Sequence, residues 1–175
     1  SRIINSSIDL DFILNNVLLT CLGKFLATRG IIALKEKNKI VLKSSKGITP
    51  ELLQEFPELE ASPNCLDDPK LNSFMHIGNL HVVEKISSSD DCIGLVCLGE
   101  KLNKSEYTED DIEFLGTILN ISATAVQNSM VINELRKVNR QLDSRVQRLS
   151  SLFELSKEFG SFAESFRVVK LLVFS

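Results

Sequence analysis

The sequence predicts an α/β fold of the α+β kind, a central antiparallel sheet flanked by helices, with a long C-terminal coiled-coil helix. Three observations predict it. A wide apolar helical stripe opens the chain, two pairs of short β-like runs follow, and the last third lacks proline and has helical, then heptad, spacing. With 175 residues, of which 43% are hydrophobic and 25% charged, the chain fits one domain with an appendage.

The first predicted helix covers residues 9–28. Its apolar residues recur at the i, i+3, i+4, i+7 spacing that gives a helix one wide buried face. Two β-like runs follow at 31–37 and 40–45. The polar Asn38-Lys39 turn separates them, so they are expected to pair as an antiparallel hairpin.

The middle of the chain predicts a short helix, a loop and a second hairpin. Thr49 and Pro50 suit the N-cap and first position of a helix that ends before Pro57. Residues 57–70 are rich in proline and acids and predict a surface loop, followed by a strand around 74–77. Residues 81–87 and 92–101 predict the second hairpin, whose second strand is apolar on both faces and therefore central in the sheet.

The last third predicts one long helix that begins after Thr108. Thr108 and Asp111 have the spacing of a capping box, and an apolar stripe follows from Ile112 to Met130. The pattern then tightens to the 3-4-3-4 spacing of a coiled-coil seam, in which Arg145 is the one flaw. We therefore expect a homodimer through a seam formed by Val131, Leu135, Val138, Leu142, Leu149 and Leu152.

These patterns divide the chain into a globular domain at 5–130, a coiled-coil helix at 131–160, and the start of a following module at 161–175. The last segment repeats the apolar pattern of residues 6–20. Two interpretations stay open. The segment begins a second copy of the first helix, or the likeness is only the one that any two amphipathic helices show.

The stretch 93–135 resembles the C-terminal half of a GAF domain. The resemblance rests on a glycine-containing central strand, a loop, an aromatic residue before an acidic run, and an alanine-rich helix before an asparagine. The residues that match these features are Gly94, Gly99, Tyr107, Glu109–Asp111, Ala123, Ala125 and Asn128. The resemblance implies a sheet with helices on one face and a ligand pocket on the other. It also implies homodimers through the terminal helices and an output domain downstream.

The most specific ligand that the resemblance implies is a cyclic nucleotide. Members that bind one carry an Asn-Lys, Phe, Asp-Glu motif, which Asn103-Lys104, Tyr107 and Asp111 match in part, with Ile112 in place of the final acid. Lys104 is expected to pair with an acid of the next helix and hold the loop to it. A pocket is expected between the sheet and residues 48–80, near Arg29, Lys35, Phe74 and His76, although this short region also fits a degenerate pocket.

Several other functions find no support in the sequence. No coherent nucleophile or acid–base set predicts an enzyme, and the isolated His76 and His81 predict no metal site. Cys92 and Cys97 are expected on opposite faces of one strand, which argues against a disulfide relay. Basic residues beside the seam suit a coiled coil better than nucleic acid, and no apolar run is long enough to predict a membrane span.

Two functions therefore remain. In the first, the domain senses a small molecule and relays the signal through a dimeric helix to an output domain. In the second, it binds no ligand and only assembles the output enzyme as a dimer. Four cysteines without a disulfide or metal spacing indicate a reducing compartment, hence the cytoplasm, for either one.

Overall fold

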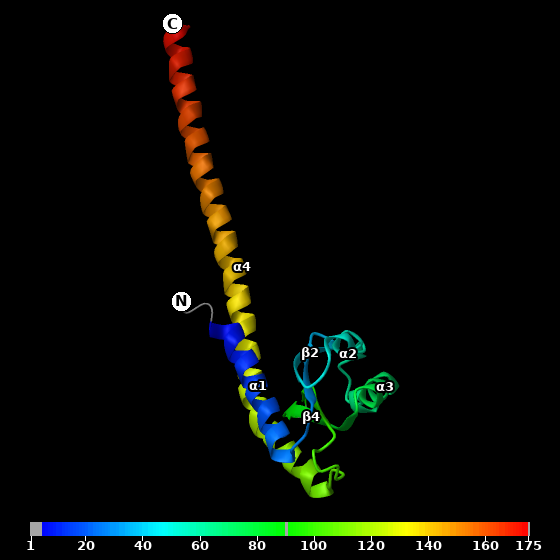
Figure 1. Cartoon of the computed structure of the whole chain (residues 1–175). Helices are drawn as coiled ribbons and strands as arrows, with labels where there is room; N and C mark the ends of the chain where they lie inside the picture. The colour runs from blue at the N-terminus through cyan, green and yellow to red at the C-terminus, as the bar shows by residue number, and fades with distance from the viewer. Residues whose placement is uncertain (1–4, 90, 175) are drawn as a thin grey trace. The chain divides into compact units, whose positions relative to one another are not determined.

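The computed structural model describes residues 5–89 and 91–174 and separates two compact units, residues 1–132 and residues 133–175. The first unit (Figure 1) contains an antiparallel sheet. The sheet has five strands in the order β3-β2-β1-β5-β4. Its strands are β1 (Gly30–Glu36), β2 (Lys39–Lys46), β3 (Leu59–Glu60), β4 (Leu80–Ser88) and β5 (Asp91–Gly99). The predicted fold class, an antiparallel sheet flanked by helices, is confirmed.

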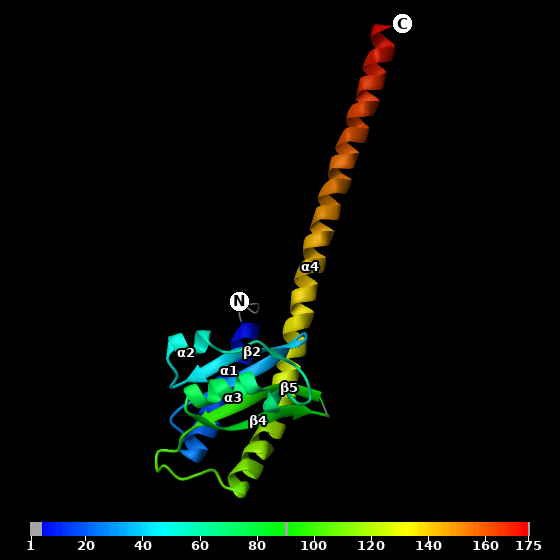
Figure 2. The same cartoon turned by 90° about the vertical axis from the view of Figure 1, so that its right-hand side faces the viewer.

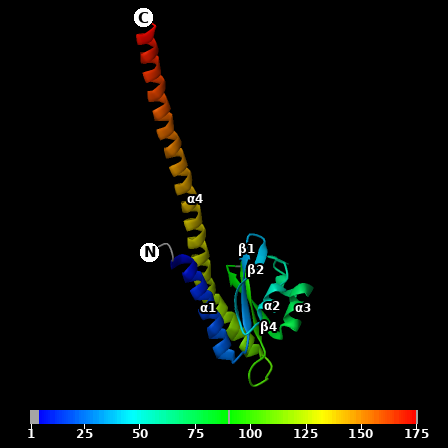
Figure 3. The same ribbon diagram turned by 45° about the horizontal axis from the view of Figure 1, so that its top comes forward.

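Helices cover both faces of this sheet. On one face lie α1 (Asn5–Phe25) and the part of α4 (Glu109–Val173) that belongs to the first unit. On the other face lie α2 (Pro50–Gln54), the short 3₁₀ helix η1 (Cys65–Asp67) and α3 (Pro69–Ile77). Figures 2 and 3 show the sheet between these two groups of helices. The second face is therefore also packed, whereas the resemblance implied a ligand pocket there.

The α1/α4 face holds the larger apolar cluster. Leu14 and Leu18 of α1 and Leu115 and Leu119 of α4 are fully buried against it. These residues stand three or four apart along each helix, so each helix turns one apolar stripe to the sheet. The stripe predicted from the sequence is thus the one that packs.

The two predicted hairpins form as expected and join through their inner strands. β1 pairs with both β2 and β5, and β5 lies between β1 and β4. Leu95 of β5 faces the α2/α3 cluster, while Val96 faces the α1/α4 cluster, so the strand is buried on both sides. Gly94 is required where β1 and β5 approach closely, because a Cβ there would lie 2.4 Å from the Ala33 carbonyl oxygen.

The strand expected at 74–77 is wrong, since these residues belong to helix α3. Asp68 caps the helix by accepting a hydrogen bond from the Lys70 amide at 2.8 Å, and Pro69 takes the first helical position. Leu71, Phe74 and Met75 then repeat at three- and four-residue intervals on the buried side. The preceding loop at 57–70 also contains β3 and η1.

Helix α4 is longer than predicted and runs from Glu109 to Val173. Its start is the expected capping box. Thr108 Oγ1 accepts from the Asp111 amide at 3.2 Å, and the Asp111 carboxylate accepts from the Thr108 amide at 2.9 Å. The second unit is helical up to Val173, so the expected module at 161–175 stays a prediction. Among the residues that the structure describes, no helix is long and apolar enough to cross a membrane.

Candidate functional site

The end of β5 and the start of α4 are joined around one buried lysine. Lys101 is only 9% exposed, and its Nζ lies 2.5 Å from the Asp111 Oδ2 of α4 and 3.3 Å from the Glu106 carbonyl oxygen. A buried ammonium needs such partners because removing a charge from water is costly. The three groups therefore hold the connecting loop and the helix start in one arrangement, which we call the β5–α4 clasp.

Tyr107 completes the clasp. Its hydroxyl donates a hydrogen bond of 2.7 Å to the carbonyl oxygen of Gly99, and Lys101 Nζ lies 4.8 Å from the centre of its ring. Partial burial and the nearby Asp111 carboxylate raise the pKa of Tyr107 to about 12. The phenol therefore stays neutral and acts as a hydrogen-bond donor and a packing surface.

The charge state of Asp111 is set by the same contacts. The hydrogen bond from Lys101, followed by the one from the Thr108 amide, holds the pKa of Asp111 below its ordinary value. The carboxylate thus serves two purposes at neutral pH, as the ion-pair partner of Lys101 and as part of the cap of α4.

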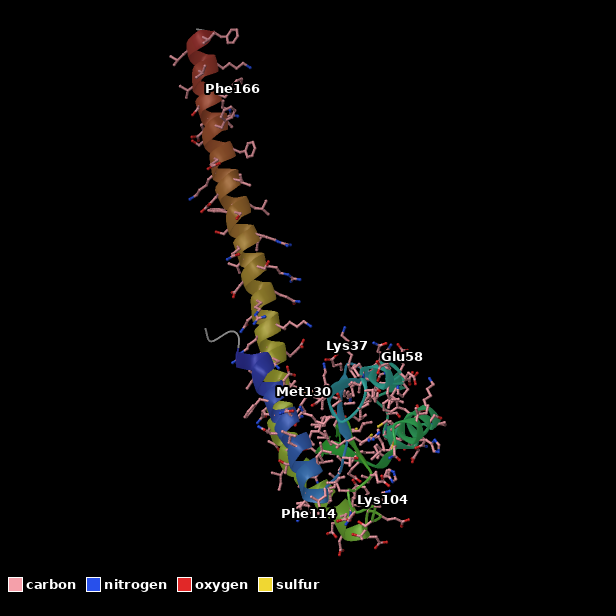
Figure 4. All side chains as sticks on the ribbon, viewed as in Figure 1. Lys37, Glu58, Lys104, Phe114, Met130 and Phe166 are labelled. Atoms are coloured by element: carbon pink, nitrogen blue, oxygen red, sulfur yellow. The ribbon has the colours of Figure 1, made fainter. Side chains whose placement is uncertain are left out.

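The ion pair predicted for Lys104 is formed by a different lysine. The lysine that pairs with the helix is Lys101, whereas Lys104 is exposed in the loop, where Figure 4 labels it. Lys104 has a φ of +58° and donates its amide to the Lys101 carbonyl, so it closes a turn. Asn103 stabilises the same loop, because its Oδ1 accepts from the amide and hydroxyl of Ser105. The missed signal was that Lys101 stands only two residues after the buried strand β5, where the backbone still pairs with Ala27.

A hollow of about 310 Å³ adjoins the clasp. It is lined by His81 and Val82 of β4, by Glu106 and Tyr107 of the loop, and by Ile112 of α4. Its polar residues include Glu106 and His81, whose Nε2 is hydrogen-bonded to Asn79 Oδ1 at 2.9 Å, and Tyr107 connects it to the clasp. Its volume is at the lower end of the range of small-molecule sites.

The four residues expected to bind a ligand do not form one group. Arg29 and Lys35 stand at opposite ends of β1, about 20 Å apart at about 3.3 Å per residue. Arg29 Nη1 donates to the Gly78 carbonyl after α3, and Lys35 Nζ pairs with Asp91 at 3.1 Å. Each of these cations thus already has a partner within the domain.

Phe74 and His76 lie on different sides of α3. Phe74 is 3% exposed and packs edge-to-face against Phe56 with a centroid distance of 5.2 Å, while His76 is exposed. Around Phe74, the space where a pocket was expected is occupied by apolar side chains; they include Leu52, Leu59, Leu71, Met75 and Leu95. Within the described residues there is also no cluster of three or more side chains that bind metals.

The predicted seam residues of α4 are all solvent-exposed in the single chain. Their exposed fractions run from 42% at Val138 to 66% at Leu149. Exposed apolar side chains continue along the second unit; they include Leu155, Phe159, Phe162, Phe166 and Val169 (Figure 4 labels Phe166). A row of this length on one helix is unusual for a surface that only faces water.

Compared by sequence, the chain matches no family model and no curated protein. Compared by structure, it matches several solved domains. One is the GAF domain/HD domain protein from Geobacter sulfurreducens, with a TM-score of 0.55 and 12% identity over 70% of this chain and 95% of that one.

Two further structures agree. The blue-light absorbing form of the PixJ GAF domain from Thermosynechococcus elongatus has a TM-score of 0.54 and 8% identity over 78% of this chain and 96% of that one. The second GAF domain of DevS from Mycobacterium smegmatis has a TM-score of 0.53 and 12% identity, over 73% and 99%. At such identities the likeness shows the fold, which these domains share with the present chain.

Proposed function

Since the chain contains a GAF-like domain, we propose that it is a regulatory domain of a signal-transduction protein and acts by pairing α4 with the α4 of a second copy. The fold supports the regulatory role, because the matching structures include a GAF/HD protein and a domain of a putative two-component sensor histidine kinase from Sinorhizobium meliloti. The domain itself would be non-catalytic, with the output activity in another domain of the full-length protein.

The observation that carries the proposal is the exposed seam from Val131 to Leu152. Its leucines and valines follow the three- and four-residue spacing, interrupted only at Arg145, and all are at least 42% exposed. Burying a leucine side chain contributes about 1.5–3 kcal/mol, so covering the seam is strongly favourable. A second copy offers an identical seam with the same spacing, and a two-fold axis lets both seams cover each other.

The β5–α4 clasp suggests how a change in the domain would reach the seam. Lys101 and Tyr107 tie the end of a central strand to the first turn of α4. A displacement of β5 or of the loop would therefore act on the start of the helix that carries the seam. An input changes the pairing only if it binds one arrangement of the helices better than the other.

The test is the molecular mass in solution. Leu142→Lys with Leu149→Lys places four charges in the seam of a dimer, and we expect it to be monomeric at micromolar concentration. Ser144→Lys with Ser151→Lys is the matched control, because it adds the same charge to exposed helix positions outside the seam. Sedimentation equilibrium on both variants and the parent decides: a monomeric parent, or a dimeric Leu142/Leu149 variant, would contradict the proposal.

A second candidate function is sensing of a small molecule, and the hollow beside the clasp favours it. A ligand that bridges His81 and Glu106 would contact Tyr107 and Ile112 and so act directly on the start of α4. A cyclic nucleotide remains the specific ligand proposed from the Asn103, Lys104, Tyr107 and Asp111 pattern. The packed α2/α3 face supports the hollow rather than that face as the place where a ligand would bind.

A thermal-shift screen with cyclic and linear nucleotides and amino acids tests this second function. We expect a ligand to raise the melting temperature of the parent and to lose its effect in His81→Ala. His76→Ala is the control, because His76 is also exposed but lies outside the hollow. If no compound shifts the melting temperature of a protein that is dimeric, the assembly role alone is favoured.

A further inference from the structure

The segment between α2 and α3 crosses the α2/α3 face of the sheet from one edge to the other. At one edge, Leu59 of β3 pairs with Ile40 of β2. At the opposite edge, the Pro63 carbonyl accepts a hydrogen bond from Lys85 Nζ of β4. We call residues 59–67 the strap. It includes η1, whose first residue, Cys65, is 2% exposed.

A β-bulge turns Cys92 toward the strap. In the regular part of the β4–β5 ladder, Cys97 faces the α2/α3 side, and strict alternation would place Cys92 on the α1/α4 side. The register shifts between Ile86 and Ser87, and Ile93 packs in the α1/α4 cluster. Its neighbour Cys92 therefore faces the α2/α3 side, as bulges often re-aim side chains. The expectation that Cys92 and Cys97 lie on opposite faces is thus wrong.

The two cysteines meet where the strap reaches β4 and β5. Cys92 and Lys85, which binds the strap at Pro63, are both near enough to the Cys65 thiol to influence its ionisation. Cys92 Sγ also contacts the Gly94 carbonyl oxygen at 3.4 Å. Both cysteines are free, and they are 27 positions apart in the sequence, so no sequence motif links them.

We propose that Cys65 and Cys92 form a redox-sensitive pair that a hydroperoxide oxidises to a disulfide, which ties the strap to β5. The proposal rests on the strap that brings Cys65 to β4 and β5 and on the bulge that turns Cys92 to the same face, and it holds whether or not the chain dimerises. The other two cysteines serve as internal controls, because Cys21 and Cys97 are buried in the two apolar clusters.

The chemistry balances with hydrogen peroxide as the oxidant. The Cys92 thiolate attacks one peroxide oxygen, the O–O bond breaks, and the departing hydroxide takes a proton to become water. The resulting sulfenic acid is attacked by the Cys65 sulfur, which loses its proton; an S–S bond forms, and the S–O bond breaks to release a second water. Two thiols thus supply two electrons and two protons.

The two sulfurs have different positions, which sets the order of these steps. Cys92 is partly exposed and can meet the oxidant, whereas Cys65 is buried. Burial, with the neighbouring Cys92 as a further cause, raises the pKa of the Cys65 thiol, while Lys85 acts in the opposite direction. Because the thiolate is the attacking form, Cys65 suits the second step, in which its partner is already nearby.

Peptide mapping after oxidation of the folded protein tests the pair. With a small excess of hydrogen peroxide, we expect the parent to lose two of its four thiols. A tryptic cross-link should join residues 47–70 to residues 86–101, and dithiothreitol should remove it. The second peptide also contains Cys97, so Cys97→Ala is the matched control and should form the same cross-link. Cys65→Ser and Cys92→Ser should not form it.

Three outcomes would overturn the proposal: no cross-link in the folded parent, a bond that requires Cys97, or a bond between two chains.

Hydrogen exchange then measures how the disulfide affects the strap. Oxidation should slow exchange of the strap amides by roughly tenfold in the parent and in Cys97→Ala, but not in Cys65→Ser. Equal exchange in the oxidised and reduced parent would contradict the claim that the bond restrains the strap.

Discussion

The two parts of helix α4 both repeat apolar residues at three- and four-residue intervals, but they have opposite burial. In the first unit, Leu115 and Leu119 are fully buried against α1 and the sheet. Further along the same helix, Leu142 and Leu149 are half-exposed or more. A three- and four-residue period therefore predicts that one face of a helix is buried. It does not predict whether the same chain or a partner buries that face.

The difference lies in what the same chain supplies. Residues 109–132 find an apolar sheet and α1, so their stripe is satisfied within one domain. The seam beyond Val131 has the tighter heptad spacing, which suits a second helix of the same kind rather than a sheet. Substitutions in the two parts of α4 should therefore affect different properties, the first the stability of the domain and the second its association.

The largest effect is expected for Leu119→Ala. It removes a fully buried side chain and leaves a cavity, so the free energy of unfolding should fall by about 2–5 kcal/mol. Leu142→Ala is the matched control and should change it by less than about 0.5 kcal/mol in dilute, monomeric protein. Chemical denaturation of both variants measures the difference, and equal losses would mean that the two parts of α4 are buried alike.

The next effect concerns the clasp at the start of α4. Asp111→Ala leaves the Lys101 ammonium buried without its carboxylate and removes one half of the capping box. Since Asp111 is partly exposed, we expect the free energy of unfolding to fall by about 2–3 kcal/mol, which is less than the range for fully buried pairs. Asp110→Ala, the exposed neighbour, should cost less than about 0.5 kcal/mol.

The contribution of Asp111 should also depend on pH in one direction. Its pKa is lowered in the folded protein, first by the hydrogen bond from Lys101, so folding favours the ionised form. The stabilisation is fully present above the ordinary pKa of about 3.9 and is lost as the pH falls through the folded value. The difference in unfolding free energy between the parent and Asp111→Ala should therefore shrink on acidification below about pH 4; an unchanged difference would argue against the ion pair.

Tyr107 gives a smaller effect and a direct spectroscopic signal. Tyr107→Phe removes the hydrogen bond to Gly99, which should cost about 1 kcal/mol. The chain has one tyrosine and no tryptophan, so its alkaline absorbance titration reports this phenol alone. We expect a midpoint near 12, with stability lost as the pH rises above the ordinary value of about 10. A midpoint near 10 in the folded protein would mean that Tyr107 is not part of the clasp.

Much of the fold was predictable because it depends on local patterns. The capping box at Thr108 and the two hairpins follow from residues a few positions apart, and the structure has them where the sequence indicates. Helix α3 was missed because its apolar run is short, and such runs do not separate strand from helix by period alone. The signal that was present was Asp68-Pro69, a cap followed by a first helical position.

The candidate site was less predictable because it depends on how strands are paired. Lys101 and Lys104 both stand in the loop after β5. Which of them is buried depends on the residue at which the pairing of β4 with β5 ends. Cys65 and Cys92 come together through a bulge and a strap that crosses the sheet. Neither feature has a sequence period, so alternation alone gave the wrong face for Cys92.

The smallest effect is expected where α1 and α4 meet at the surface. Lys24 Nζ lies 4.5 Å from the centre of the exposed Phe114 ring, a contact worth about 0.5–1 kcal/mol at such a site. Lys24→Met keeps the aliphatic stem and removes the charge, so the unfolding free energy should fall by about 0.5 kcal/mol. Lys46→Met, at an exposed position of β2, is the control and should change nothing measurable. If both variants have the same free energy of unfolding, the contact between Lys24 and Phe114 does not stabilise the first unit. The buried stripe and the clasp then hold α4 in that unit without it.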